Sequence, residues 1–184
     1  MRLEGKVSLV TGAGSGIGKS IAEVFAKEGS KVVVSSRRAV NGQPVADGIV
    51  RDGGEAVFMQ CDVSVDEDVK SLIGKTIETY GRIDVLVNNA GVNFVRPFEA
   101  VRPDDWDRVI NTDLRGTYLC SWYAIPYMLK QGRGSIVNIT TVHTLACLPG
   151  AAPYDAAKWG VVGLTKPAMR PATSPGPIFW PTAA

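Results

Sequence analysis

The sequence predicts an α/β fold in which a doubly wound parallel sheet lies between two layers of helices. Two observations predict this fold. Short runs rich in valine and isoleucine alternate along the chain with longer segments whose apolar residues recur every three or four positions. The apolar runs lack the polar alternation of a half-exposed strand, which indicates strands buried on both faces. Strands joined through helices form right-handed crossovers, so we expect the spatial strand order 3-2-1-4-5.

Five strands are expected, at residues 6–11, 31–36, 56–61, 84–88 and 134–141. The first strand leads into a glycine-rich turn and then a helix that carries Ile17, Ile21 and Phe25 on one face and ends at Gly29. This strand, turn and helix form the first unit of the predicted sheet.

Four further helical segments connect or follow the later strands. They are a weak helix over 38–52, a regular helix over 65–80, a long helix over 103–131, and a helix that begins at Tyr154 and reaches Lys166. We expect Gly42 and Pro44 to interrupt the first of these helices. We expect Pro126 to bend or divide the long one, because proline removes a helical hydrogen bond.

The composition fits one ordinary globular domain. The 184 residues are 45% apolar and carry 20 basic and 18 acidic side chains, for a net charge of +2. These values exclude a disordered chain, a collagen-like repeat and a disulfide scaffold. The apolar runs are too short for a transmembrane helix or a signal peptide, so we expect a cytoplasmic protein without membrane contact. No basic stripe with interleaved aromatic residues indicates a nucleic-acid partner.

The cysteines and the sole histidine do not predict a metal site. Cys61, Cys120 and Cys147 are odd in number and widely spaced, which favours buried thiols in a reducing compartment over disulfides. His143 has no cysteine or carboxylate at ligand spacing. We expect it in the wall of a substrate pocket or in a structural role.

The turn after the first strand has the composition of a phosphate cradle. It reads TGAGSGIG and includes Gly12, Ser15, Gly16, Ile17 and Gly18. Glycines let the backbone turn tightly and approach a pyrophosphate, which then lies at the free N–H groups of a helix N-terminus. The alternative is an ordinary glycine-rich loop with no ligand. The position of this turn between a strand and a helix favours the phosphate-binding interpretation, because that mechanism requires both elements.

The end of the second strand favours NADP(H) over NAD(H). A carboxylate at this place would bind the ribose 2′-hydroxyl and repel a 2′-phosphate. The chain instead has Ser35 and Ser36 followed by Arg37 and Arg38. Guanidinium groups match a phosphate in charge and geometry. The alternative is that the two arginines form a solvated helix start.

A tyrosine and a lysine stand four residues apart at the start of the last helix. This spacing places the Tyr154 phenol and the Lys158 ammonium on one helix face. A nearby cation favours the phenolate, so we expect Lys158 to lower the pKa of Tyr154. The pair can then exchange a proton with a carbonyl or alcohol oxygen.

Over residues 3–166 the sequence resembles the classical short-chain dehydrogenase/reductase (SDR) family. The resemblance is carried by T-G-x-x-x-G-I-G in the turn, N-N-A-G at 88–91 and Y-x-x-x-K at 154–158. It implies a Rossmann-type dinucleotide-binding domain and NADP(H)-dependent interconversion of a carbonyl and a secondary alcohol. The substrate would be a small molecule, of the 3-oxoacyl-carrier-protein or sugar-alcohol type, and members of the family are usually homo-oligomers.

The resemblance also implies roles for particular residues. Tyr154 would be the general acid/base, and Lys158 would also hold the nicotinamide ribose. The remaining cofactor contacts would come from Asp62 at the adenine and its neighbour Val63, from Asn88, which ties strands together, and from the backbone of Ala90 and Gly91.

Two catalytic positions depart from the family pattern. Thr141 stands where the family usually has serine; it keeps the hydroxyl that orients the substrate oxygen, and Thr140 is the weaker alternative. Asp113 stands where the family has an asparagine that supports a water relay. A carboxylate there can pair with Lys158. Asn111, two residues earlier, is expected on the helix surface.

The resemblance ends near Lys166. We expect Pro167 to stop the last helix and residues 167–184 to form an irregular proline-rich tail. Residues 174–178 resemble a Pro-Gly segment of the family but come too early in the chain. A deletion, a frameshift or a natural variant would each produce this ending, which we interpret as a C-terminal truncation or alteration.

The ending affects both solubility and function. Without a sixth strand, the fifth strand would be an exposed apolar edge, so we expect poor solubility of an isolated monomer and partial loss of the subunit interface. Two alternatives to an active oxidoreductase therefore stay open. They are a non-catalytic dinucleotide-binding module and an inactive truncated member of the family.

Overall fold

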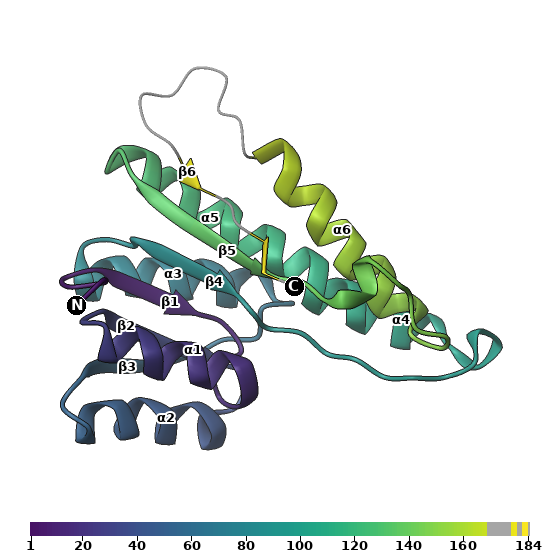
Figure 1. Ribbon diagram of the computed structural model, residues 1–184, viewed down its shortest axis with the longest axis horizontal. Coiled ribbons are helices and arrows are strands. Elements are labelled where there is room, and N and C mark those ends of the chain that lie inside the picture. Colours follow the sequence, from purple (N-terminus) through teal and green to yellow (C-terminus); the bar gives the residue numbers. More distant parts are fainter. Residues whose placement is uncertain (169–177, 180–181, 184) are drawn as a thin grey trace.

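A parallel sheet runs through the centre of the computed structural model, which describes residues 1–168, 178–179 and 182–183 (Figure 1). The strands are β1 (Val7–Val10), β2 (Lys31–Ser36), β3 (Glu55–Gln60), β4 (Val85–Asn88), β5 (Gly134–Ile139), β6 (Ile178–Phe179) and β7 (Thr182–Ala183). Their order β3-β2-β1-β4-β5-β6, with β7 also on β5, confirms the predicted order of the first five strands.

The helices cover both faces of this sheet. They are α1 (Gly16–Lys27), α2 (Ala39–Arg51), α3 (Asp66–Tyr80), α4 (Pro103–Val109), α5 (Gly116–Lys130) and α6 (Ala152–Ala168). Three short segments join them: η1 (Phe98–Ala100) and η3 (Val142–Thr144) are 3₁₀ turns, and η2 (Ile110–Arg115) is π-helical. None of the helices in the described part of the chain is long and apolar enough to cross a membrane.

Alternate residues of the central strands supply two separate cores. Leu9 of β1 and Leu86 of β4 pack with α3 and α5 on one face. Their neighbours Val10 and Val87 pack with α1 and α2 on the other face. Successive side chains of a strand point to opposite faces, so strands that are apolar at every position need helices on both sides. The doubly wound prediction is confirmed for this reason.

Helix α2 is continuous, whereas the sequence predicted interruptions at Gly42 and Pro44. Gly42 has a packing reason: a β-carbon at this position would collide with the ring of Phe58 on β3. The missing side chain lets α2 close onto the sheet. Pro44 lies within the helix, which therefore forgoes one backbone hydrogen bond without breaking.

The long helix predicted over 103–131 is divided at η2, and the expected division at Pro126 was wrong. Residues Ile110–Arg115 form a π-helical segment between α4 and α5, while Pro126 lies inside α5. The Thr117 hydroxyl donates to the carbonyl of Asp113 at 2.7 Å and stabilises the end of this segment. A π turn has no simple sequence pattern and frequently marks a functional site.

The expectation of a bare edge at β5 needs correction. Gly134 and Ser135 pair with β6, and Asn138 and Ile139 pair with β7, so two short strands from the C-terminal segment lie along this edge. The expected irregular tail thus contains two strands. The segment at 174–177 lies outside the described residues.

The last helix also differs from its predicted bounds. It begins at Ala152 rather than Tyr154 and continues through Pro167 to Ala168, where a stop was predicted. Its start is explained by Pro153, which is favourable in the first helical turn because a proline there loses no helical hydrogen bond.

Two of the three cysteines are buried, as predicted, and Cys147 is exposed. Burial raises the pKa of the Cys61 thiol to about 12 and also raises the pKa of Cys120. The prediction of a buried thiol was wrong for Cys147, which lies in the turn between β5 and α6.

A buried hydrogen-bond network joins β4 and β5 to the helices beside them. The amide of Asn88 donates to the Asn138 side-chain oxygen at 2.8 Å and to the Ser121 hydroxyl at 3.1 Å. The amide of Asn138 in turn donates to the hydroxyl of Thr165 on α6 at 3.0 Å. This network fixes α6, and hence the residues near its start, against the sheet.

Replacing Asn138 by alanine should lower the free energy of unfolding. The change removes the acceptor of a buried amide and the donor to a buried hydroxyl, and a buried polar group left unpaired costs about 1–3 kcal/mol. Urea unfolding followed by circular dichroism measures the loss. Asn93→Ala, at an exposed loop position, is the control and should change stability by less than about 0.5 kcal/mol. Equal stability of the two variants would contradict a structural role for the network.

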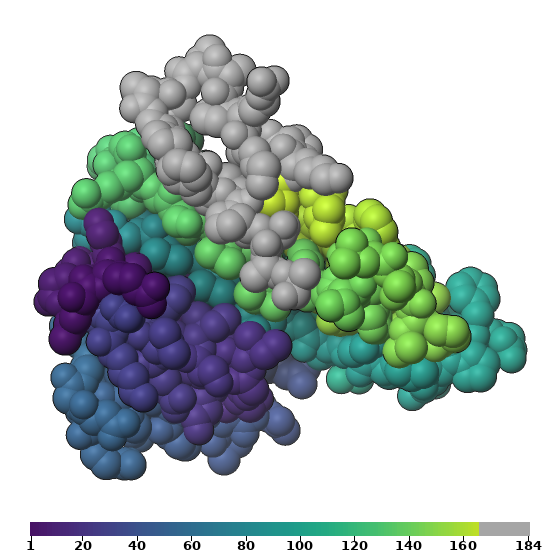
Figure 2. All heavy atoms as spheres, viewed as in Figure 1, coloured from purple at the N-terminus to yellow at the C-terminus, as the bar shows by residue number. Residues whose placement is uncertain are grey.

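One end of the molecule extends beyond the sheet. The segment between β4 and α4 loops out beside η3 and the start of α6 (Figure 1). Figure 2 shows this segment as a projection (teal), with the N-terminal residues (purple) at the other end of the same face. The backbone of Arg96 donates to the carbonyl of Gly150 at 2.9 Å, which connects the two loops of the projection.

Candidate active site

The carboxyl ends of β1, β2 and β4 enclose a hollow of about 190 Å³. Seven residues predicted to bind a cofactor line it: Gly12, Ser15, Arg37, Asp62, Val63, Ala90 and Gly91. Crevices at this edge of an open parallel sheet are the usual ligand sites of such folds. These residues are far apart in the sequence but close in space, because parallel strands bring all their carboxyl ends to one edge of the sheet.

The glycine turn packs directly on the N-N-A-G segment. Gly12 has a φ of 63°, and a β-carbon there would lie 2.7 Å from the α-carbon of Ala90. The Asn89 amide donates to the carbonyl of Thr11 at 3.0 Å and to that of Gly12 at 3.2 Å. A β-carbon at Gly18 would collide with the same amide. The glycines therefore permit close packing of two loops that form one wall.

The N-terminus of α1 faces the hollow through Ser15. Ser15 is the extended residue before the helix, which begins at Gly16. The first N–H groups of a helix have no partner within it and favour an anion. Ile17 is not among the residues that line the hollow; it is 64% exposed and lies with Ile21 on an apolar strip of α1.

Two arginines stand at the end of β2, at the mouth of the hollow. Arg37 and Arg38 both line it and both are exposed. A guanidinium nitrogen of Arg37 lies 3.9 Å from a carboxylate oxygen of Asp62. The other oxygen of Asp62 accepts from the backbone and hydroxyl of Ser64 at 3.0 and 2.6 Å, which orders this part of the wall.

The structure adds lining residues that the motifs did not identify. Asn41 and Thr112 join the wall from α2 and η2. Asn41 packs on the glycine turn, since a β-carbon at Gly14 would lie 2.8 Å from that of Asn41. Asn41 comes three residues after Arg38, one turn into α2. A helix that starts just after Arg38 places Asn41 on the same side as Arg38, so the sequence could have identified it as a lining residue. Thr112 becomes a wall residue only through the tertiary fold.

The four predicted catalytic residues converge beside this hollow. Tyr154 and Lys158 lie on α6, and the Lys158 ammonium is 5.5 Å from the centre of the Tyr154 ring. Thr141 lies between β5 and η3 and hydrogen-bonds the Tyr154 phenol through its side chain. Asp113, on η2, approaches from the side of the hollow. The structure therefore places a phenol, a hydroxyl, an ammonium and a carboxylate together.

A buried ion pair connects this group to the wall of the hollow. The Lys158 ammonium lies 3.3 Å from one oxygen of Asp113 and donates to the carbonyl of Ile139 at 3.1 Å. The other oxygen of Asp113 accepts from the backbone of Val92 at 2.8 Å. A β-carbon at Gly91 would lie 2.7 Å from the first oxygen. Gly91 and Val92 both line the hollow, so the predicted catalytic group and the hollow share a wall.

The Tyr154 pKa differs from its predicted direction. Burial raises the pKa of the phenol, the Thr141 hydrogen bond lowers it, and the charges of Asp113 and Asp155 raise it further. The net direction is upward, whereas Lys158 was expected to lower it. The first physical reason is burial of the phenol; the Asp113 and Asp155 carboxylates add to it, and Lys158 is itself paired with Asp113.

His143 lies edge-on to the Tyr154 ring, with 5.7 Å between ring centres. Its Nδ1 atom lies 2.8 Å from an oxygen of Asp155, and the other oxygen of Asp155 accepts from the backbone of Leu148 at 3.3 Å. The backbone of His143 donates to the Thr141 hydroxyl at 3.3 Å. His143 therefore packs against Tyr154 and supports the turn that carries Thr141.

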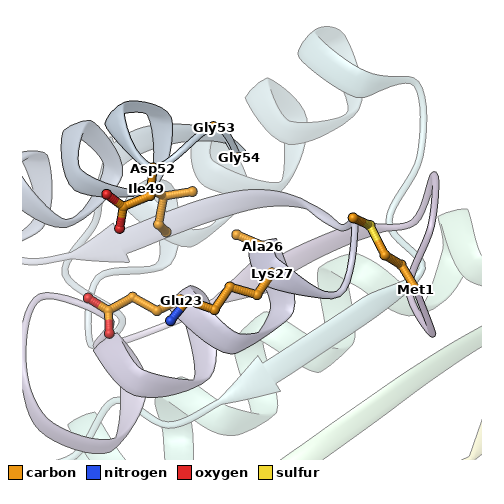
Figure 3. A pocket seen from close by; sticks show the side chains of 8 residues that line it. All are labelled: Met1, Glu23, Ala26, Lys27, Ile49, Asp52, Gly53 and Gly54. Atoms are coloured by element: carbon orange, nitrogen blue, oxygen red, sulfur yellow. The ribbon is translucent and has the colours of Figure 1, made fainter.

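A second hollow, of about 260 Å³, lies between α1 and α2 (Figure 3). Its walls include Met1, Lys27 and Gly54, which precede β1, β2 and β3 respectively. The hollow is therefore at the amino ends of the strands, away from the group around Tyr154. Figure 3 shows the side chains of Glu23 and Lys27 on α1 and of Asp52 after α2 around it.

Comparison with known proteins gives a consistent result. A family model described as short chain dehydrogenase matches residues 6–176. A 3-oxoacyl-[acyl-carrier-protein] reductase of Thermotoga maritima is 41% identical over 170 residues, which cover 90% of this chain and 68% of that protein. A 3beta-hydroxysteroid dehydrogenase of Mediterraneibacter gnavus is 42% identical over 166 residues, which cover 90% of this chain and 60% of that protein.

The chain spans about two thirds of the length of the relatives it matches; for an uncharacterized oxidoreductase of Thermotoga maritima, 41% identical, the figure is 64%. Among solved structures, a metagenomic short-chain oxidoreductase in complex with NADP is similar, with a TM-score of 0.88 and 36% identity. That match covers 92% of this chain and 77% of the other.

Proposed function

Because the chain belongs to the short-chain dehydrogenase family, we propose that it binds NADP(H) and interconverts a carbonyl compound and a secondary alcohol. One observation carries the proposal. Tyr154, Thr141 and Lys158 meet at the carboxyl edge of the sheet, and the Lys158–Asp113 ion pair joins them to the wall of the hollow that the glycine turn forms.

The residues present fit a dinucleotide phosphate. The turn from Gly12 and the N-terminus of α1 offer backbone N–H groups for the pyrophosphate. Arg37 and Arg38 supply positive charge for a 2′-phosphate, and Asp62 and Val63 form the wall where an adenine would lie. A bound nicotinamide supplies a hydride in reduction and accepts one in oxidation. The similar structure with bound NADP supports this assignment.

Tyr154 supplies the proton chemistry in this proposal. In reduction its phenol donates a proton to the carbonyl oxygen as that oxygen gains negative charge; in oxidation the phenolate takes the proton of the alcohol. The Thr141 hydroxyl hydrogen-bonds the same substrate oxygen and orients it. Lys158 has three N–H donors; one goes to Ile139, and the ammonium also lies 3.3 Å from Asp113, so a donor remains for the nicotinamide ribose.

The substrate class we propose is a 3-oxoacyl thioester, with a sugar or other secondary alcohol as the alternative. Two relatives, from Thermotoga maritima and a Synechocystis species, are named 3-oxoacyl-[acyl-carrier-protein] reductases and are each 41% identical to this chain. The hydroxysteroid dehydrogenase among the relatives shows that similar identity also accompanies another alcohol. We further propose that the chain assembles as a homo-oligomer.

Two measurements on the purified chain test the proposal. Fluorescence titration with NADPH measures cofactor binding, and NADPH oxidation at 340 nm is followed with a panel of 3-oxoacyl thioesters, sugars and ketones. Binding with turnover of at least one carbonyl supports the proposal. Absence of NADPH binding would overturn it.

Binding without any turnover would favour a non-catalytic dinucleotide-binding module. One feature favours this second function: Asp113 engages the Lys158 ammonium at the position where a neutral residue would leave it free.

Replacing Arg38 or Arg37 by alanine should weaken NADPH binding by about tenfold or more, because a hydrogen bond to a charged group contributes about 1.5–3 kcal/mol. NADH lacks the 2′-phosphate that these guanidinium groups would bind, so the affinity for NADH should change by less than about twofold. Fluorescence titration with both cofactors measures the two effects. Arg51→Ala, at the far end of α2, is the matched control. Equal losses for NADPH and NADH would contradict recognition of the 2′-phosphate.

A further inference from the structure

We propose that Asp113 is a positioning residue that holds the Lys158 ammonium and cancels its charge at Tyr154, so that the Tyr154 phenol stays protonated through neutral pH. The inference rests on the proposed function, in which Tyr154 exchanges the proton. Beyond that function, the inference names the group that determines the pH range in which reduction and oxidation each proceed.

The ion pair is fixed from both sides. Asp113 is fully buried; one of its oxygens lies 3.3 Å from the Lys158 ammonium without an aligned hydrogen bond, and the other accepts from the backbone of Val92 at 2.8 Å. The Lys158 side chain is only 5% exposed, and its ammonium also donates to Ile139. Burial raises the pKa of the Asp113 carboxyl, whereas the Lys158 charge and the Val92 N–H act in the opposite direction and favour the carboxylate. Little water can screen charges in such a place, so the carboxylate acts on the lysine at short range.

The π-helical segment accounts for the placement of the carboxylate. Asp113 lies in η2, which packs against α6, the helix that carries Tyr154 and Lys158. On the opposite side, Gly91 leaves room for the carboxylate, since a β-carbon there would lie 2.7 Å from its oxygen. A larger residue at either place would displace the ion pair.

The charges that face Tyr154 sum to a negative value. From η2 comes Asp113, from α6 come Lys158 and Asp155, and from η3 comes His143, which contributes no charge when neutral. One cation thus stands against two carboxylates. If residue 113 were an amide, the sum would be zero and the lysine would favour the phenolate. Burial and the two carboxylates raise the pKa of the phenol in this chain, and only the Thr141 hydrogen bond acts in the opposite direction.

The two directions of the reaction need opposite forms of this phenol. Reduction needs the protonated phenol as a donor, whereas oxidation needs the phenolate as an acceptor. A phenol with a raised pKa is protonated at neutral pH, so carbonyl reduction should proceed there. For alcohol oxidation, kcat/KM should rise about tenfold per pH unit into the alkaline range until the pKa of Tyr154 is reached.

The test reads the ionisation of Tyr154 directly, without cofactor or turnover. The chain is labelled with ¹³C at the tyrosine Cζ atom, and the resonance of Tyr154 is assigned with Tyr154→Phe. In the unmodified chain the midpoint should lie at or above the ordinary tyrosine value of about 10. In Asp113→Asn it should fall by about one to three pH units, because the Lys158 ammonium then loses the carboxylate that lies 3.3 Å from it and its charge acts more strongly on the phenol.

A double variant separates charge cancellation from a general disturbance. Asp113→Asn with Lys158→Met removes both charges, so its midpoint should return to within about one pH unit of the unmodified chain. Asp107→Asn, an exposed carboxylate on α4, is the matched control and should leave the midpoint unchanged.

Two results would overturn the inference. One is a midpoint below pH 8 in the unmodified chain, a result for which Asp113→Asn need not fold. The other is a folded Asp113→Asn variant whose midpoint does not fall. A lowered midpoint in Asp113→Asn without turnover in any variant would instead reject the proposed function and leave the charge cancellation standing.

Discussion

Replacing Tyr154 by phenylalanine should lower kcat/KM for the carbonyl substrate by about 10²–10⁴-fold, the usual contribution of a positioned general acid. The ring and its edge-on contact with His143 remain, and only the hydroxyl near Thr141 is lost. NADPH affinity should change by less than about twofold, because the phenol acts on the substrate oxygen rather than on the phosphates.

Steady-state kinetics measures the first effect and fluorescence titration the second. Tyr127→Phe is the matched control, since Tyr127 lies on α5 and is 40% exposed. This control should keep full turnover. If Tyr154→Phe also kept full turnover, Tyr154 would not be the acid/base, whatever the cofactor affinity.

Replacing Gly12 by alanine should destabilise the chain and abolish tight cofactor binding. Gly12 has a φ of 63°, which costs an alanine about 1–2 kcal/mol. The new β-carbon would also meet the Ala90 backbone at 2.7 Å, and overpacking costs about 1–3 kcal/mol more. Relief of this collision must push the glycine turn away from the N-N-A-G segment, which opens the wall of the hollow.

Gly16→Ala is the control that isolates the collision from the backbone conformation. Gly16 also has a positive φ, of 54°, but a β-carbon there meets no atom within 4 Å. Urea unfolding should therefore show a loss for Gly12→Ala about 1–3 kcal/mol greater than for Gly16→Ala. NADPH affinity should fall at least tenfold further in Gly12→Ala on the same grounds. Equal behaviour of the two variants would show that the close packing of the turn on Ala90 is unimportant.

Much of the sheet was predictable because its physical signal is local. A run such as Val7–Val10, which reads VSLV, has apolar residues on both faces of the strand, which requires burial on both faces and hence helices on both sides. The motif residues were predictable for a related reason. Parallel strands end at one edge, so a glycine turn after β1 and arginines after β2 had to meet there.

The errors share a cause as well. The sequence predicted interruptions at Gly42 and Pro44 and a bend or division at Pro126 from backbone propensity, but α2 and α5 continue through these positions because tertiary packing outweighs propensity. The actual irregularity is η2, which contains no glycine or proline, although Gly116 follows it directly. Its position depends on contacts with α6, which lies far along the chain.

The sequence by itself determined the fold class, the strand order and the chemical types of residue at the candidate site. The tertiary structure alone decided the electrostatics of that site. The sequence allowed Asp113 to pair with Lys158, 45 positions further along the chain, but only the structure places their charged atoms 3.3 Å apart in a buried place. Burial of the phenol, together with the Asp113 and Asp155 carboxylates, reverses the expected direction of the Tyr154 pKa. Coulomb interactions depend on distance and burial. Neither quantity can be derived from the spacing of residues along the chain.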